Sequence, residues 1–299
     1  MKCGICLAGG GVKGAAHIGA LKALEEEGIN IECISGTSSG SIVATLYAAN
    51  YSTEEILNIF NKYSKKIKYI DLKSIINIIK RIFQERRFLI EGFNSGEIIE
   101  NMINELCMRK GIENIKDIKN NLLIASVSIN TGKVYFFENM QSDFRYSDGF
   151  VHIQDINIGK AVRASCSFPG VFCPCPINND LLVDGGIREN VPWKEMKEKG
   201  IDKVLCITFE EDRTIKKYKN IIDIVSGSIS LMGRELSNYE LNGADNILTI
   251  KTKEVSLLDF REINYLYTQG YSQTKKFLKK YLSNACSSTK LTCIEGKKL

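Results

Sequence analysis

One stretch limits what this chain can fold into more than any other: residues 34–42, Ile-Ser-Gly-Thr-Ser-Ser-Gly-Ser-Ile. It holds one G-x-S-x-G match, from Gly36 to Gly40, with Ser38 at its centre. An apolar run precedes it and a helix-forming run follows it, which predicts a strand, a sharp turn and a helix. Such a turn exposes the serine hydroxyl and places the amide dipole of the helix behind it. An isolated match is more often a glycine-rich turn whose serines cap a helix, so other motifs must decide.

A glycine-rich segment, Gly9 to Gly14, lies between a short apolar strand pattern and a helix pattern. Consecutive glycine amides at a helix N-terminus form a donor site for an anionic oxygen, and Lys13 adds positive charge beside it. The spacing also matches the dinucleotide fingerprint, which expects an acid at the end of the second strand. The chain has Ser35 and Gly36 there. We therefore predict an oxyanion site, and a nucleotide-dependent enzyme stays open as an alternative.

A third motif is an apolar run that ends in Asp184 and is followed by Gly185 and Gly186. An acid at the end of such a strand can reach the mouth of the sheet where Ser38 is expected. Taken alone, the Asp-Gly pair is a common turn. The two motifs upstream favour a functional role.

Four segments of the chain, in this order, resemble the patatin-like phospholipase family. They are Gly9–Gly14, Gly36–Gly40, Ala164–Phe172 and Asp184–Gly186. The resemblance covers residues 4 to about 210. It implies a serine-aspartate dyad, with Ser38 as the nucleophile and Asp184 as the general base.

The resemblance also implies the remaining site residues and the activity. The amides of Gly10 and Gly11 are the expected oxyanion donors, supported by Gly9 and Lys13. The glycines that complete the motifs are Gly14, Gly36, Gly40, Gly185 and Gly186. The expected function is hydrolysis of carboxylic esters of phospholipids or related lipids, without a metal or cofactor. The alternative is a catalytically weak lipid-binding or signalling protein on the same fold.

The histidine count gives the dyad independent support, because the chain has only two histidines. His17 lies inside the first helix pattern, and His152 lies in a polar stretch that we expect to be a loop. Neither is expected at a strand end, so a Ser-His-Asp triad has no obvious histidine. We expect His17 to pack or cap structurally and His152 to lie on the surface.

Alternating strand and helix patterns predict a three-layer α/β/α sandwich around a central, mostly parallel sheet. Residues 122–130 and 133–138 are expected to form a hairpin or neighbouring strands. The strand at 203–209 is expected beside the strand of Asp184. With 299 residues, of which 44% are hydrophobic, the chain can bury one large core. We expect a hydrolase domain over 1–282 and a polar tail over 283–299.

Composition limits the partners and the compartment. The net charge of +5 mildly favours anionic surfaces, and no motif indicates nucleic acid. No apolar run is long enough to span a bilayer, and no secretory segment precedes the first strand, so we expect a cytoplasmic protein. The ten cysteines are too sparse for a disulfide scaffold and lack zinc spacing. We expect them to be small apolar fillers in a reducing compartment.

Residues 62–110 are expected to form a helical insertion or cap, and their first part is unusually basic. Nine lysines and arginines stand against two acids in residues 62–89, among many isoleucines. One interpretation is an element that makes peripheral contact with an anionic membrane surface. The other, which we favour, is an ordinary helix with a solvated basic face.

Overall fold

The computed structural model describes residues 2–64, 94–140, 149–212, 221–257 and 259–285. Its strands form one sheet with the order β5-β4-β3-β2-β1-β8-β9, and β6 and β7 lie off this path. The strands are β1 (Cys3–Leu7), β2 (Cys33–Thr37), β3 (Asn121–Ser128), β4 (Val134–Glu138), β5 (Phe150–Ile153), β6 (Cys175–Ile177), β7 (Asp180–Asp184), β8 (Lys203–Glu211) and β9 (Asn246–Thr252). The five consecutive strands β3, β2, β1, β8 and β9 are parallel. The predicted mostly parallel sheet is confirmed.

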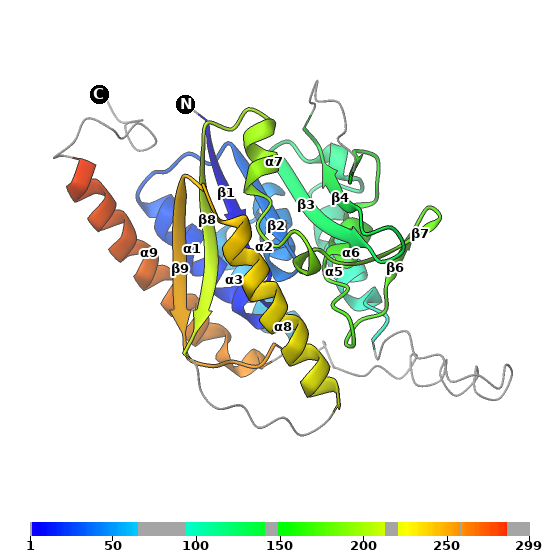
Figure 1. Ribbon diagram of the computed structural model, residues 1–299. Helices are drawn as coiled ribbons and strands as arrows, with labels where there is room; N and C mark the ends of the chain where they lie inside the picture. Colours follow the sequence, from blue (N-terminus) through cyan, green and yellow to red (C-terminus); the bar gives the residue numbers. More distant parts are fainter. Residues whose placement is uncertain (1, 65–93, 141–148, 213–220, 258, 286–299) are drawn as a thin grey trace, which may run out of the picture.

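Helices cover both faces of this sheet (Figure 1). The helices are α1 (Gly14–Glu26), α2 (Ser39–Ala48), α3 (Thr53–Ser64), α5 (Glu97–Met108), α6 (Ile158–Ser165), α7 (Trp193–Glu198), α8 (Ile221–Glu240) and α9 (Ile263–Ala285). Short 3-10 turns are η1 (Gly11–Lys13), η2 (Ile115–Asp117), η3 (Gly185–Ile187) and η4 (Phe260–Glu262). One hydrophobic cluster contains α1, α2, α3, α5, α6 and α9, and a second contains α7. The chain is therefore an α/β/α sandwich.

The two clusters arise from the alternation of side chains along buried strands. In β3, Leu122 and Ile124 point into the first cluster, whereas Leu123 and Ala125 point into the second. Successive side chains of a strand point to opposite faces, so a strand covered on both sides must be apolar throughout. This is why the sheet strands are nearly continuous hydrophobic runs in the sequence.

The placement of β7 differs from the prediction and determines the position of Asp184. The strand β8 lies between β1 and β9, not beside β7. Instead, β7 pairs with β3 in the antiparallel direction, and Asp184 stands opposite Ser126. The predicted neighbourhood of β7 and β8 is wrong because strand order follows tertiary packing, which a local pattern does not contain. The expected pairing of residues 122–130 with 133–138 is confirmed, since β3 and β4 pair in the antiparallel direction.

Two further expectations concern cysteines and the region 62–110. Six buried cysteines carry no disulfide, as expected for apolar fillers: Cys6, Cys33, Cys107, Cys166, Cys175 and Cys206. Cys3 is disulfide-bonded, so the filler prediction is wrong for that residue, since a buried-strand pattern does not indicate pairing. The helix α5 packs into the first cluster through Ile99, Met102 and Ile103. Residues 65–93, with most of the basic segment, lie outside the described residues.

Candidate active site

The turn between β2 and α2 holds Ser38 in an unusual backbone conformation. Its φ is 53° and its ψ is −126°. Few non-glycine residues have a positive φ, and a strained serine at this turn is typical of a nucleophile elbow. The turn is tight: a methyl group on Gly36 would lie 2.3 Å from the carbonyl oxygen of Gly40. The amide of Ser38 donates to Ser165 Oγ at 2.9 Å, which fixes the elbow to the end of α6.

Asp184 reaches the elbow because β7 continues where β2 ends. The last residue of β2, Thr37, pairs with Ala125 of β3, and Asp184 pairs with the next residue, Ser126. The side chains of Ser38 and Asp184 are close enough for the hydroxyl to lower the carboxyl pKa. Asp184 Oδ1 accepts the amide of Gly186 at 2.8 Å, whereas Oδ2 has no hydrogen bond of standard geometry within the described residues. Such contacts often tighten only when substrate binds.

Burial changes the acidity of this aspartate. Asp184 is 2% exposed, and burial raises its pKa to about 6, against smaller opposite effects of Ser38 and the Gly186 amide. Removing water from around a carboxyl disfavours its charged form. Asp184 is therefore a stronger base than an ordinary aspartate, which suits it to accept a proton from a hydroxyl.

The glycine loop lies beside Ser38, with its amides used in different ways. The amide of Gly9 donates to Asn190 Oδ1 at 2.8 Å, so it is not open to an oxyanion. The amides of Gly10 and Gly11 make no hydrogen bond in the described part of the chain. These two amides therefore remain the candidate oxyanion donors. Gly14 packs against Ser39, the residue after the candidate nucleophile.

Gly11 is the loop residue that a side chain would disturb most. Its φ is +60°, and an added methyl group would lie 2.5 Å from the carbonyl oxygen of Leu257. That carbonyl also accepts the amide of Val12 at 2.8 Å. Only glycine adopts such a conformation without strain and permits so close a backbone approach.

Lys13 differs from its expected role beside the oxyanion. Its Nζ lies 3.0 Å from Glu211 Oε1, and both side chains are largely buried. The ammonium also lies over the ring of Phe209. Because Glu211 neutralises most of this charge, Lys13 supports the loop through the ion pair rather than as an uncompensated cation.

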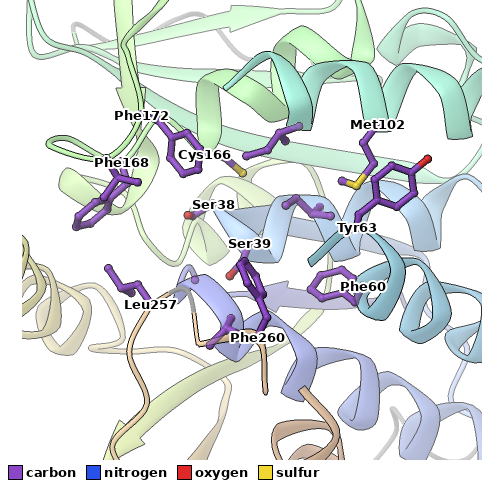
Figure 2. A pocket seen from close by; sticks show the side chains of 15 residues that line it. Ser38, Ser39, Phe60, Tyr63, Met102, Cys166, Phe168, Phe172, Leu257 and Phe260 are labelled. Atoms are coloured by element: carbon purple, nitrogen blue, oxygen red, sulfur yellow. The ribbon is translucent and has the colours of Figure 1, made fainter. Parts of the chain in front are cut away.

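Two cavities of different character meet at Ser38. The first, of about 100 Å³, is lined by apolar side chains from α2, α3, α5 and the segment after α6. Figure 2 shows Phe60, Tyr63 and Met102 together at one end of it and Phe168 and Leu257 nearer to Ser38. The second, of about 1060 Å³, has a mixed lining that is far more polar than that of the first, and we call it the polar cavity. It is lined by the glycine loop, Asp184 and one side of α8. A group bound at Ser38 can therefore extend into an apolar space on one side and a polar space on the other.

Asn190 and Ser165 were not predicted from the sequence. Asn190 holds the glycine loop through Gly9, and its Nδ2 donates to Ser237 Oγ at 2.8 Å. Its own amide donates to Glu240, whose pKa burial raises to about 7. Ser165 belongs to a segment that carried the family resemblance, which could have drawn attention to it. Nothing in the local sequence singles out Asn190.

The anchoring role of Asn190 leads to a first prediction. Asn190→Ala should lower the turnover of ester hydrolysis about tenfold with little change in KM, because a lost hydrogen bond of about 1 to 1.5 kcal/mol releases the loop that carries the donors. Asn130→Ala is the matched control, since Asn130 is exposed and bonds Asp180 away from the elbow. Steady-state kinetics on a soluble ester measures both. Equal turnover in the two variants would contradict the anchoring role.

The two histidines take no part in this arrangement. His17 is fully buried in α1, and its Nε2 lies 2.7 Å from the carbonyl oxygen of Ala8. Burial lowers its pKa to about 4, so the ring is neutral at neutral pH and donates to that carbonyl. The expectation that His17 packs structurally is confirmed. His152 was expected in a surface loop, which is wrong: it lies on β5, next to the phenyl ring of Phe136. Its pairing with β4 was not visible in the polar stretch that contains it.

His152 belongs to the one group of described residues with ligand types and spacing suited to a metal ion, Glu138, His152 and Glu195. His152 Nδ1 lies 2.8 Å from Glu138 Oε1. The buried ammonium of Lys199 lies 2.6 Å from Glu138 and 3.6 Å from Glu195. A cation in this place would have to compete with Lys199, so the donor set fits a buried ion-pair network better than a metal site.

Comparison with known proteins agrees with the geometry. Residues 5–197 match the model of the patatin-like phospholipase family. The chain belongs to this family. The matched region contains the glycine loop, the elbow and the Asp-Gly-Gly turn, so all the candidate site residues of this patatin-like chain lie within it.

The matched region covers very different fractions of the relatives of this patatin-like chain. The uncharacterised protein YqhO of Bacillus subtilis is 29% identical over 293 residues, which cover 91% of this chain and 97% of YqhO. A lysophospholipase, NTE1 of Candida albicans, is 28% identical over 238 residues, which cover 77% of this chain and 15% of NTE1. The chain thus spans only a small part of the fungal relative.

Two solved structures share the fold. VipD from Legionella pneumophila has a TM-score of 0.52 and 17% identity, over 93% of this chain and 67% of VipD. ExoU in complex with SpcU, from Pseudomonas aeruginosa, has a TM-score of 0.50 and 21% identity, over 95% of this chain and 52% of the matched chain. At these identities the likeness concerns the fold alone.

Within the described residues, none of the helices combines the length and apolar composition needed to cross a bilayer.

Proposed function

We propose that this chain is a serine acyl hydrolase that cleaves carboxylic esters of phospholipids or related lipids with Ser38 and Asp184. The observation that carries the proposal is the buried carboxyl of Asp184 beside a strained serine, at the meeting point of an apolar and a polar cavity. Family membership supports the reaction class. The two histidines offer no competing base at the elbow.

In the proposed mechanism, Ser38 Oγ attacks the ester carbonyl carbon while Asp184 takes the hydroxyl proton. The developing oxyanion accepts the amides of Gly10 and Gly11. When the C–O bond to the alcohol breaks, Asp184 returns the proton to the leaving oxygen. A water molecule, deprotonated by Asp184, then attacks the acyl-serine. Asp184 returns this proton to Ser38 Oγ as the acyl–oxygen bond breaks and the fatty acid leaves.

The two cavities support a substrate with one acyl chain and a polar remainder. The apolar cavity is narrow and ends at Phe60, Tyr63 and Met102, so we place the acyl chain there. The alcohol with its headgroup extends into the wider polar cavity. The name of the fungal relative, a lysophospholipase, supports a substrate with a single acyl chain.

A substrate panel tests the proposal. Wild type and Ser38→Ala are assayed on lysophospholipids, diacyl phospholipids and soluble short-chain esters, with products identified by mass. Fatty acid release by wild type and its loss in Ser38→Ala support the reaction. Ester hydrolysis retained by a folded Ser38→Ala would rule out Ser38 as the nucleophile. Absence of hydrolysis by wild type on every substrate would support the alternative of a lipid-binding or signalling protein. Saturable nucleotide binding in a titration would instead favour the nucleotide-dependent enzyme.

The raised pKa of Asp184 predicts the pH dependence of the reaction. Only the carboxylate form accepts a proton, so kcat/KM on a soluble ester should rise as pH passes through about 6 and level off above it. An ordinary aspartate would give this rise near pH 4. Initial rates between about pH 4 and 8, on protein whose fold is checked at each pH, measure the midpoint. A midpoint near 4 would contradict the buried base.

Met102 leads to a prediction about acyl chain length. Met102 lies at the far end of the apolar cavity and is almost fully buried. Met102→Ala should lengthen the cavity and raise the ratio of kcat/KM for a laurate ester over a butyrate ester several-fold, since each buried methylene contributes about 0.8 kcal/mol. Met108→Ala, on the exposed face of the same helix, is the control. An unchanged ratio in Met102→Ala would place the acyl chain elsewhere.

A further inference from the structure

The helix α8 carries an unusual share of the exposed apolar surface. Of the ten large hydrophobic residues exposed in the described part of the chain, five lie on this helix. They are Ile224, Val225, Leu231, Met232 and Tyr239. Since α-helical residues follow at about 100°, these five share one face. Soluble surfaces rarely gather such residues without a partner.

The part of this face from Ile224 to Met232 is also uncharged. Residues 224–233 contain no ionisable side chain. Glu235, which is exposed, lies on the same face one turn beyond Leu231 and ends the uncharged run. The hydroxyl of Ser228, on the same face, donates to the carbonyl oxygen of Ile224 at 2.9 Å. This hydroxyl is thereby already bonded, which reduces the cost of removing that part of the face from water. The chemistry suits a hydrocarbon or interfacial environment rather than a charged one.

The opposite face of α8 forms a wall of the polar cavity beside Ser38. Its lining residues are Ser226, Gly227, Ile229, Ser230, Gly233 and Arg234. A methyl group on Gly233 would lie 3.3 Å from the carbonyl oxygen of Gly186, next to Asp184. A methyl group on Gly170, beyond the lip of the apolar cavity, would lie 3.9 Å from Val225. The helix therefore separates the exposed apolar face from the polar cavity by its own width only.

From these observations we propose that the exposed face of α8 docks onto the surface of a lipid aggregate and brings the mouth of the site to it. In Figure 1 the N-terminal end of α8 extends past the carboxyl ends of β8 and β9, the edge of the sheet where the site lies. Docking through Ile224, Leu231 and Met232 places the aggregate next to the cavity that receives the lipid. The inference rests on the proposed function, since a lipid hydrolase meets its substrate at such a surface. It concerns a different element and a different lipid chemistry from the basic segment at 62–89.

Vesicle binding tests the proposal without turnover. Vesicles of diether phosphatidylcholine contain no carboxylic ester, so binding is measured while nothing is hydrolysed. Leu231→Ser/Met232→Ser should lower the partition coefficient about tenfold or more, because two half-exposed apolar side chains no longer enter the interface. The control is Ile129→Ser/Met108→Ser, which changes residues of nearly equal exposure: Ile129 and Met108 are each 60% exposed, Leu231 59% and Met232 71%. The control should bind like wild type.

Salt and a soluble substrate separate this proposal from its competitors. Binding through the apolar side chains of this face should change little between low and high salt, whereas attraction to basic residues would be screened. Both double variants should keep wild-type activity on a soluble short-chain ester. If wild type hydrolyses the soluble ester fully but does not bind the vesicles, the docking surface is overturned and the proposed function stays intact. Vesicle binding without any hydrolysis of ester lipids would leave the docking surface and remove the proposed function.

A second measurement places the helix itself. Brominated diether lipid should quench the tryptophan fluorescence added by Met232→Trp and should not quench that added by Met108→Trp, on α5. Trp193 is present in both variants and gives the same background fluorescence. Equal quenching of the two variants, binding unaffected by Leu231→Ser/Met232→Ser, or binding lost at high salt would each overturn the proposal. So would a wild-type dimer that the same double variant converts to a monomer in light scattering, since a second copy would then cover this face.

Discussion

Asp184→Asn is expected to lower the turnover of ester hydrolysis on the order of 10³-fold, because an amide cannot accept the Ser38 proton. The variant should stay folded, since asparagine has the same shape and its Oδ1 can still accept the Gly186 amide. Burial raises the pKa of Asp184, so the ionised group opposes folding above about pH 6. At pH 8 the melting temperature of Asp184→Asn should therefore equal or exceed that of wild type.

Loss of activity together with kept stability separates a base from a structural carboxylate. His152→Gln is the control, because His152 lies in an ion-pair network on β5 and should leave most of the activity intact. Turnover and thermal unfolding are measured for all three proteins. Near-normal hydrolysis by folded Asp184→Asn, or loss of hydrolysis in folded His152→Gln, would contradict the dyad.

Gly11→Ala is expected to lower turnover by about 10²- to 10³-fold, with a much smaller change in KM. The added methyl group would lie 2.5 Å from the Leu257 carbonyl oxygen, and the positive φ of Gly11 adds strain. The loop must shift, and its amides then miss the oxyanion, which develops only in the transition state. Steady-state kinetics on a soluble ester give kcat and KM separately.

Gly111→Ala serves as the matched control for backbone strain. Gly111 has a φ of +72°, but a methyl group there would meet nothing within 4 Å. Both variants lose a little stability for the same reason, and circular dichroism checks their folding. Unchanged turnover in folded Gly11→Ala, or an equal loss in Gly111→Ala, would remove the glycine loop from the mechanism.

The local parts of the fold and site could be predicted because each is written in consecutive residues. The strand, turn and helix around Ser38 follow from an apolar run, a glycine pair and a helix-forming run. The Gly9–Gly14 loop and the strand that ends at Asp184 follow in the same way. Glycines mark close backbone approaches, which leave few alternatives to the turn observed.

What could not be predicted depends on contacts between distant segments. Which strand lies beside β7 is determined by tertiary packing, so β8 was expected there in error. His152 was expected in a loop because its stretch is polar, although β5 pairs with β4. The support of Asn190 for Gly9 joins residues 181 positions apart. No periodicity or spacing in the sequence records such a contact.

The antiparallel pairing of β7 with β3 makes the site sensitive to shifts in strand register that the fold itself would tolerate. Sliding β7 by one residue would turn the Asp184 carboxylate to the other face of the sheet, and sliding it by two would move the carboxylate by roughly 7 Å. Asp180 resists such slippage, because Ser128 and Tyr135 both donate to its carboxylate. Single-residue insertions or deletions within residues 178–183 should therefore yield proteins that keep a cooperative unfolding transition yet cannot hydrolyse esters. Among natural insertions and deletions in proteins of this family, those in this hairpin should abolish activity without lowering the amount of protein in the cell.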